Sequence, residues 1–309
     1  MEYCDFGIYK ISRLGLGTVQ LGLNYGIANR LGKPNKEDAY QILSAAISGG
    51  VNFFDTARKY GDSEIILGEY FSRLRPKENV IYCSKISNIS TEISNVKELQ
   101  VYINNQINQT LNHLRISKLP FYMLHDSKDL KIYNKKIIEI LNELKDEGKI
   151  ANFGVSVYTE DDVKNVLQFD DISVIQIPIN IFNSKLHIEG YIKELAEKKI
   201  FIIARSIFLQ GLFFLEPEEV KLKVPAAEQP MKELREFAKK IRLSIDELAL
   251  GYVKSIPEIS TIIIGAETPA QVKRNISLFN ETMLSRTIIE DLGNLFANLP
   301  NNVVNPSLW

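Results

Sequence analysis

Short apolar segments alternate along the chain with longer amphipathic ones. The apolar segments are bounded mostly by Gly, Asn, Pro or charged residues, and several are rich in Val, Ile or Phe, which is typical of buried parallel strands. The predicted strands are Leu14–Thr18, Val51–Thr56, Val80–Lys85, Phe121–His125, Phe153–Ser156, Val174–Ile177, Phe201–Ala204 and Thr261–Ile264. The helical patterns between them are Lys36–Ser48, Glu64–Arg73, Val96–Leu114, Lys135–Glu147, Glu160–Leu167, Tyr191–Lys199, Met231–Arg242 and Pro269–Phe279.

This alternation predicts an α/β fold, a closed (β/α)8 TIM barrel that spans residues 1–309 as one domain, with its active site at the carboxyl ends of the strands. A doubly wound sheet is the main alternative. Gly15 and Gly17 lack the third glycine and the following helix of a dinucleotide-binding fingerprint, which disfavours it.

Three segments depart from the repeat. Residues 207–229 show no clear periodicity after the seventh strand, so we predict an irregular binding loop or lid there. An additional helix pair, Met231–Arg242 and Ile245–Lys254, is expected before the eighth strand. The segment Asn302–Trp309 shows no pattern.

Composition and charge narrow the class of protein. The 37 Lys and Arg residues nearly balance 38 Asp and Glu residues, which argues against nucleic acid or an anionic membrane as a partner. No apolar segment is long enough to span a bilayer, and the first residues do not resemble a signal peptide. Cys4 and Cys83 cannot form a disulfide framework or a zinc site by themselves, so we expect a cytoplasmic protein without a metal. The sequence does not predict the oligomeric state.

Ionisable residues end three neighbouring predicted strands, namely Asp55, Lys85 and His125. Asp55 shares a strand face with Phe53, so an inward Phe53 would place the carboxylate at the mouth of the barrel. Tyr60 follows the second strand closely enough to fold back over that mouth. Each residue alone is more often structural than catalytic, but together they compose one coherent chemistry.

That chemistry is proton donation to a carbonyl that accepts a hydride. A free tyrosine, with a pKa of about 10, is a weak acid near neutral pH, and a nearby ammonium lowers that pKa. Lys85 can supply the ammonium for Tyr60, and Asp55 can keep Lys85 charged and oriented. His125 can donate a hydrogen bond to the carbonyl oxygen.

The segments 52–64, 83–85 and 123–125 resemble the signature of the aldo-keto reductase family, and the resemblance continues through 154–156, 175–176 and 264–266. It implies NADP(H)- or NAD(H)-dependent reduction of a small-molecule carbonyl compound, with Tyr60 as general acid. It further implies that Ser156 and Gln176 bind the nicotinamide carboxamide, with the phosphates along residues 206–211. The remaining cofactor contacts implied by the resemblance are Thr18, Arg205, Ser206, Phe208, Gln210, Gly211, Gly265, Ala266, Glu267, Gln271, Arg274 and Asn275.

Three positions depart from the best-known members of the family. Val157 stands where many members have Asn, and Arg205 replaces a Tyr that stacks on the nicotinamide, a role that a planar guanidinium can also fill. Glu267 stands where many bacterial relatives have a basic residue. The resemblance to the family favours NADPH. A carboxylate repels the 2′-phosphate of NADPH but accepts hydrogen bonds from ribose hydroxyls, so use of NADH or of both cofactors is also expected unless Lys273 or Arg274 compensates.

The substrate is predicted only coarsely. Segments 17–26 and 205–211 resemble a bacterial branch of the family linked to surface-polysaccharide or nucleotide-sugar pathways, so a sugar carbonyl is one candidate. The connection after His125 is short, which predicts a low wall on that side. The expected pocket walls are Ile27, Arg58, Tyr158 and the segment Phe208–Phe214.

Two other classes of function remain open. Voltage-gated channel β-subunits resemble the same family and act chiefly through a partner, so a cofactor-binding regulatory module is one alternative. A barrel lyase in which Lys85 forms a Schiff base is the other. That reading leaves Tyr60 and the turn at Gly265 without a role.

Overall fold

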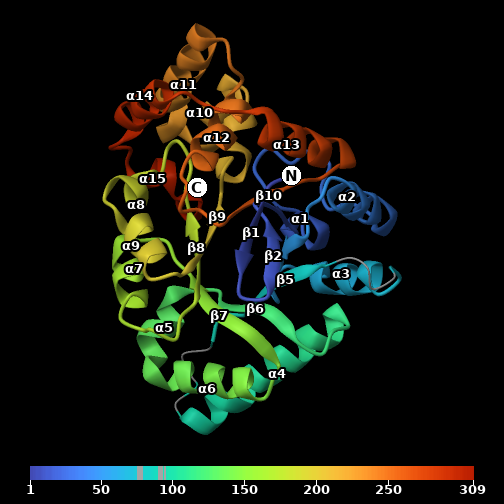
Figure 1. The fold of residues 1–309 in the computed structure, drawn as a ribbon. Helices are drawn as coiled ribbons and strands as arrows, with labels where there is room; N and C mark the ends of the chain where they lie inside the picture. Colours follow the sequence, from blue (N-terminus) through green and yellow to red (C-terminus); the bar gives the residue numbers. More distant parts are fainter. Residues whose placement is uncertain (75–78, 90–92, 94) are drawn as a thin grey trace.

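A computed structural model describes residues 1–74, 79–89, 93 and 95–309. Eight parallel strands close into a barrel in the order β10-β3-β4-β5-β6-β7-β8-β9, which confirms the predicted (β/α)8 architecture (Figure 1). The barrel strands are β3 (Leu14–Gly17), β4 (Phe53–Asp55), β5 (Ile81–Ile86), β6 (Leu119–Leu124), β7 (Ile150–Ser156), β8 (Val174–Pro178), β9 (Phe201–Arg205) and β10 (Thr261–Gly265).

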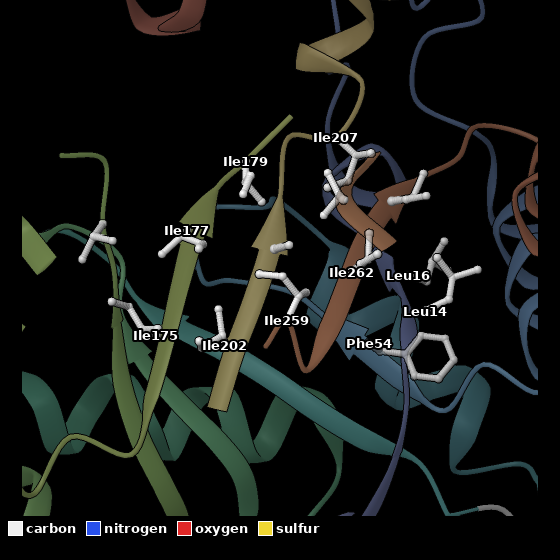
Figure 2. Close-up of a cluster of buried hydrophobic side chains, with 14 of the residues drawn as sticks. Leu14, Leu16, Phe54, Ile175, Ile177, Ile179, Ile202, Ile207, Ile259 and Ile262 are labelled. Atoms are coloured by element: carbon white, nitrogen blue, oxygen red, sulfur yellow. The ribbon is translucent and has the colours of Figure 1, made fainter. Parts of the chain in front are cut away.

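Helices surround this barrel, and their bounds lie close to the predicted ones. They are α2 (Lys36–Ser48), α3 (Ser63–Phe71), α4 (Val96–Leu114), α6 (Lys135–Asp146), α7 (Glu160–Val166), α9 (Tyr191–Glu197), α11 (Glu228–Ile241), α12 (Ile245–Lys254) and α13 (Pro269–Glu281). Their apolar faces pack on the outward side chains of the strands. Figure 2 shows part of this cluster, including Ile175, Ile202 and Ile262.

The inward side chains form a second, separate apolar cluster. Phe53, Cys83 and Met123 belong to it, as their strand parity predicted. The residues that follow at the same parity, Asp55 and Lys85, therefore lie at the carboxyl-terminal mouth of the barrel.

A hairpin at the amino end of the barrel was missed by the sequence reading. Strands β1 (Tyr3–Phe6) and β2 (Tyr9–Ser12) pair antiparallel around Gly7, whose φ of +58° is in the left-handed region that glycine tolerates. Phe6 and Tyr9 place their rings 5.9 and 5.8 Å from the ring of Phe121. The hairpin thus closes the floor of the barrel and leaves the opposite end open for a ligand.

The segments expected to be irregular contain short helices. The stretch after β9 forms η1 (Leu209–Phe214), α10 (Pro217–Lys223) and η2 (Pro225–Ala227), and Glu216 and Glu219 form a capping box on α10. The expectation of a short connection after His125 was wrong, because α5 (Ser127–Tyr133) begins there with an Asp126 cap. Short lengths and weak periodicity hid these helices.

The carboxyl-terminal residues are also more ordered than expected. They form α14 (Arg286–Phe296), α15 (Asn301–Val304) and η3 (Pro306–Leu308), and smaller elements α1 (Val19–Gly22) and α8 (Lys185–Ile188) occur earlier. Trp309 packs against the outer apolar cluster and its indole N–H donates to the Asn302 carbonyl, 3.0 Å away.

The aromatic floor of the barrel gives a stability prediction. Phe121 is fully buried and its ring contacts those of Phe6, Tyr9, Phe53 and Phe201. We expect Phe121→Ala to lower the free energy of unfolding by about 3–5 kcal/mol in urea titrations. Ile8→Ala is the control. Ile8 lies in the β1–β2 hairpin that packs on Phe121 but is itself 91% exposed, so its replacement is expected to lower the free energy of unfolding by less than about 0.5 kcal/mol. Equal effects would contradict a packed floor.

Candidate active site

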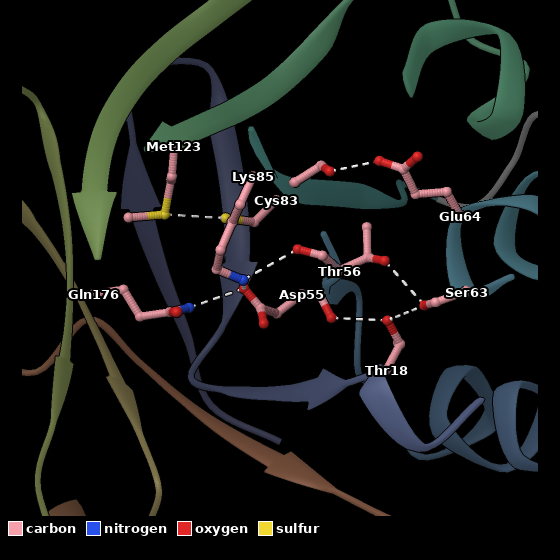
Figure 3. Close-up of polar contacts among 10 residues, drawn as sticks. Thr18, Asp55, Thr56, Ser63, Glu64, Cys83, Lys85, Met123 and Gln176 are labelled. Atoms are coloured by element: carbon pink, nitrogen blue, oxygen red, sulfur yellow. Dashed lines mark hydrogen bonds and ion pairs between the residues drawn. The ribbon is translucent and has the colours of Figure 1, made fainter. Parts of the chain in front are cut away.

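A buried ion pair lies at the open mouth of the barrel. Lys85 Nζ lies 2.6 Å from Asp55 Oδ1 and donates a second hydrogen bond of 3.0 Å to the Thr56 carbonyl (Figure 3). Gln176 Nε2 donates to the same Asp55 oxygen over 2.8 Å. Burial alone would lower the pKa of Lys85, but the adjacent carboxylate raises it above its ordinary value. The pairing with Asp55 therefore favours the charged form of a fully buried lysine.

Tyr60 stands over this pair on the loop that follows β4. Its ring centroid lies 5.2 Å from Lys85 Nζ. The loop is held tightly: a Cβ on Gly22 would lie 1.7 Å from the Tyr60 carbonyl oxygen, and Gly61 has a φ of +53°. Burial raises the pKa of the Tyr60 hydroxyl, and the Lys85 charge acts in the opposite direction. Lys85 thus offsets part of the rise in the pKa of Tyr60 that burial causes.

His125 packs edge to face against Tyr60, with ring centroids 5.7 Å apart. Burial lowers the pKa of His125 to about 3, and the positive charges of Lys85, Lys59 and Arg205 add to the effect. Its buried Nδ1 has no hydrogen-bond partner in the described part of the chain. A neutral imidazole with one N–H can donate a hydrogen bond to a ligand oxygen at this mouth.

Arg58 does not form a pocket wall, contrary to the prediction. Its guanidinium points outward between α3 and α4, where Nη1 lies 2.7 Å from Glu64 Oε2. The buried Glu64 also accepts hydrogen bonds from Ser84 Oγ at 2.6 Å and Thr110 Oγ1 at 2.9 Å. Through these three contacts the Glu64 carboxylate connects α3 to β5, to α4 and to the loop that carries Tyr60. Its removal would leave the Arg58 guanidinium without its charge partner.

A cavity of about 810 Å³ opens over these residues and extends across β9 and β10. It is lined by Asp55, Tyr60 and His125, whereas Lys85 lies behind them. The predicted cofactor residues that line it are Thr18, Ser156, Gln176, Arg205, Ser206, Phe208, Gln210, Gly211, Gly265, Glu267, Gln271, Arg274 and Asn275. Ala266 is buried and does not line the cavity, because its side chain packs into the outer apolar cluster.

Several residues along this cavity have left-handed backbone conformations. After β9, Ser206, Leu209 and Gln210 have φ angles of +63°, +48° and +54°, and Gly211 has +97°. Non-glycine residues in this region are uncommon and concentrate at functional sites. The amino end of α13 also approaches the cavity through Glu267 and Gln271, and helix amino ends favour anions.

The far end of the cavity carries two carboxylates. Glu267 lines it, and so does Asp246, whose Oδ2 lies 3.2 Å from Nε of Arg274. Of the two predicted compensating cations, Arg274 has its charge balanced by Asp246, and Lys273 is not among the lining residues. Burial raises the pKa of Glu267, and a hydrogen bond with Gln271 opposes this shift.

Several lining residues were missed by the sequence reading. Tyr25 and Gln20 line the cavity from the segment after β3, and burial raises the pKa of Tyr25 to about 12. The segment 305–307 reaches the cavity from the carboxyl-terminal region. Ile27, a predicted wall, is not among the lining residues, although its N–H donates to the Gln210 carbonyl at 3.0 Å. These contacts join distant parts of the chain and leave no periodic signal.

Within the described ranges, no group of three or more His, Cys, Asp or Glu side chains is arranged to hold a metal ion. A search of the same residues finds no helix with the length and hydrophobicity needed to cross a membrane.

Comparison with known proteins identifies similar sequences and folds. The model of the Aldo/keto reductase family matches residues 13–293. An uncharacterized oxidoreductase, YqkF, from Bacillus subtilis is 26% identical, covering 91% of this chain and 92% of that protein. The NADH-specific methylglyoxal reductase of Escherichia coli is 25% identical, covering 87% and 90%. The fold matches that of the holo form of aldo-keto reductase AKR11C1 from Bacillus halodurans, with a TM-score of 0.77, 22% identity and 96% coverage of both chains.

The environment of His125 predicts an unusual titration. A pKa of about 3 in the folded protein lies below the ordinary value of about 6.5, so protonation favours unfolding. The stability that neutral His125 contributes is present above about pH 6.5 and is lost as the pH falls toward about 3. In NMR titrations we expect the His125 ring signal, assigned with His125→Gln, to stay constant between about pH 8 and about pH 5. A midpoint near 6.5 would show that the ring is not in this environment.

Proposed function

Because the chain belongs to the aldo/keto reductase family, and so is an NAD(P)H-dependent oxidoreductase acting on carbonyl compounds, we propose that Tyr60, Lys85, Asp55 and His125 are its catalytic residues. The observation that carries the proposal is the buried Lys85–Asp55 pair directly beneath Tyr60 and beside His125, at one end of the large cavity. Perturbed titratable groups that converge in a cleft are characteristic of catalytic sites.

The cavity fits a nicotinamide dinucleotide. Ser156 and Gln176 would hold the carboxamide, the loop after β9 and the amino end of α13 would hold the phosphates, and Asn275 would contact the adenine. The bound cofactor would supply the hydride.

Tyr60 would donate the proton to the carbonyl oxygen. Burial makes the phenolate costly, and Lys85 offsets part of that cost, so the hydroxyl can lose its proton during reduction. Asp55 keeps Lys85 charged and in place, while Gln176 fixes the carboxylate by a hydrogen bond of 2.8 Å.

His125 would orient the substrate. The neutral ring offers one N–H donor to the carbonyl oxygen and cannot compete with Tyr60 as a strong acid. Edge-to-face packing against Tyr60 places the two groups at the same point of the cavity. The carbonyl carbon would then face the nicotinamide.

We further propose that NADH is preferred over NADPH. The far end of the cavity presents Glu267 and Asp246, and Arg274 already pairs with Asp246. A 2′-phosphate would meet net negative charge there, whereas ribose hydroxyls could donate to Glu267. The NADH-specific relative from Escherichia coli is consistent with this choice.

A sugar or nucleotide-sugar carbonyl is the substrate class that we propose. Tyr25, Tyr158 and Asn305 give the cavity an aromatic and polar rim, which suits a polyhydroxylated ligand.

The described chain has two free thiols, Cys4 and Cys83, which suits a reducing compartment such as the cytoplasm.

The alternatives are less well supported. A Schiff-base enzyme needs an accessible, neutral lysine, but Lys85 is fully buried, paired with Asp55 and has a raised pKa. A cofactor-binding regulatory module would have the same cavity, so reduction of a carbonyl compound by the purified protein is the observation that separates it from a reductase.

The proton-donor role predicts a specific loss of activity. We expect Tyr60→Phe to lower kcat for aldehyde reduction by about 10²- to 10⁴-fold, while the Kd for NADH stays within about threefold. Tyr25→Phe is the matched control, since it removes a second phenol from the same cavity and is expected to retain reduction within a few-fold. Steady-state kinetics and fluorescence titration provide both measurements. Full activity of Tyr60→Phe would assign the acid elsewhere.

The charge at the far end predicts cofactor choice. In fluorescence titrations, we expect wild-type protein to bind NADH more tightly than NADPH and Glu267→Arg to shift the ratio of the two Kd values toward NADPH by about tenfold or more. The replacement removes a like charge and adds an opposite one beside the 2′-phosphate. Arg286→Glu is the control, because Arg286 is exposed outside the cavity. Binding of neither nucleotide at about millimolar concentration would refute the reductase assignment.

A further inference from the structure

The carbonyl end of the cavity carries positive charge without a balancing acid. Arg205 lines the cavity, and no Asp or Glu in the described residues forms an ion pair with it. Lys59 is exposed nearby and forms no ion pair among these residues, but its charge also acts on the nearby Asp129 carboxylate, which offsets part of it. Asp55, the one acid lining this end, is neutralised by Lys85. A ligand at His125 therefore meets a net positive field.

The guanidinium of Arg205 is held in place by neutral groups. Nη2 donates to the Val157 carbonyl at 3.1 Å, and Nη1 donates to Ser206 Oγ at 3.2 Å. The guanidinium carbon of Arg205, Cζ, lies 4.3 Å from the centroid of the Tyr158 ring, so the ring covers one face of the guanidinium. A guanidinium has five N–H donors, which leaves donors on its edge for a ligand. Partly buried and preorganised, the group is suited to a planar anion.

Arg205 also stands in the wall between two cavities. The smaller one, of about 300 Å³, shares Tyr158, Arg205, Ser206, Asn305 and Pro306 with the main cavity. Its own cation, Lys185, is paired with Glu160 and Glu189. Arg205 is therefore the cation left for a ligand that extends from Tyr60 toward this wall.

We propose that the carbonyl substrate carries a carboxylate and that the free edge of Arg205 binds it while the carbonyl lies between Tyr60 and His125. The inference rests on the proposed reductase function. A carboxylate fits because one planar, singly charged group matches one unpaired guanidinium, whereas a dianionic phosphate would require further cations. Within the proposed sugar class this describes an acidic sugar, such as a uronic acid in its aldehyde form.

The test compares aldehydes that differ only in the carboxylate. Succinic semialdehyde is paired with butanal, and glucuronate with glucose, using NADH and NADPH. For wild type we expect kcat/KM to be about 10- to 100-fold higher for the acidic member of each pair. In Arg205→Met the ratio should fall to about one, because kcat/KM should fall about 10- to 100-fold further for the acidic aldehydes than for the neutral ones. Arg205→Lys should retain part of the preference, and Arg286→Met all of it.

Other outcomes would overturn the inference in distinguishable ways. Equal rates for both members in wild type, or an acid preference that survives Arg205→Met, would remove Arg205 from substrate recognition. Weaker NADH binding in Arg205→Met, with equal losses for both aldehydes, would assign the residue to the nicotinamide. A preference for glyceraldehyde 3-phosphate over the carboxylates would show that the site recognises a phosphate rather than a carboxylate. Reduction of no aldehyde at all would instead refute the proposed function.

Discussion

The buried charge of Lys85 is the constraint on which the open end of the barrel depends. An ammonium with no exposed surface needs a paired charge and hydrogen-bond acceptors, and here Asp55 Oδ1 pairs with it and accepts one hydrogen bond while the Thr56 carbonyl accepts a second. Gln176 then fixes the carboxylate. Since these residues come from β4, β5 and β8, the charge holds opposite sides of the barrel mouth in register.

Strand β5 directs polar groups to both sides of the barrel. Lys85 points inward to Asp55, and the preceding residue, Ser84, points outward to Glu64. Glu64 in turn binds Arg58 on the loop that carries Tyr60. That loop is thus fixed at one end by the Lys85 bond to Thr56 and further along by the Arg58–Glu64 pair. The position of the Tyr60 ring over the Lys85 ammonium thus follows from two ion pairs, Lys85–Asp55 and Arg58–Glu64.

Local patterns in the sequence predicted the repeating part of this structure. The parity of Phe53 and Asp55 gave the correct inward face because strand periodicity is independent of the rest of the chain. Arg58 was wrongly predicted to line the pocket, because its direction depends on its contacts with Glu64 and with Gln109 of α4, which no local pattern reveals. The hairpin over the floor and helix α5 were missed because such short elements carry too few periodic positions.

Cavity residues from outside the repeat were harder still to predict. Tyr25 and the segment 305–307 reach the cavity through long-range packing, and the Arg274–Asp246 pair joins two different helices. No spacing rule connects such residues. The net charge of −1 for the whole chain thus gives no sign that the two ends of the cavity carry charges of opposite sign.

The separation of charge along the cavity has a physical consequence for its ligands. Glu267 and Asp246 make the far end unfavourable for an extra phosphate, while Arg205 and Lys59 make the catalytic end favourable for an anion. Burial keeps His125 neutral, and the positive charges of Lys85, Lys59 and Arg205 add to this effect. In the proposed reaction the same charges would stabilise the negative charge that develops on a carbonyl oxygen, so the cation that would select an acidic substrate would also assist its reduction.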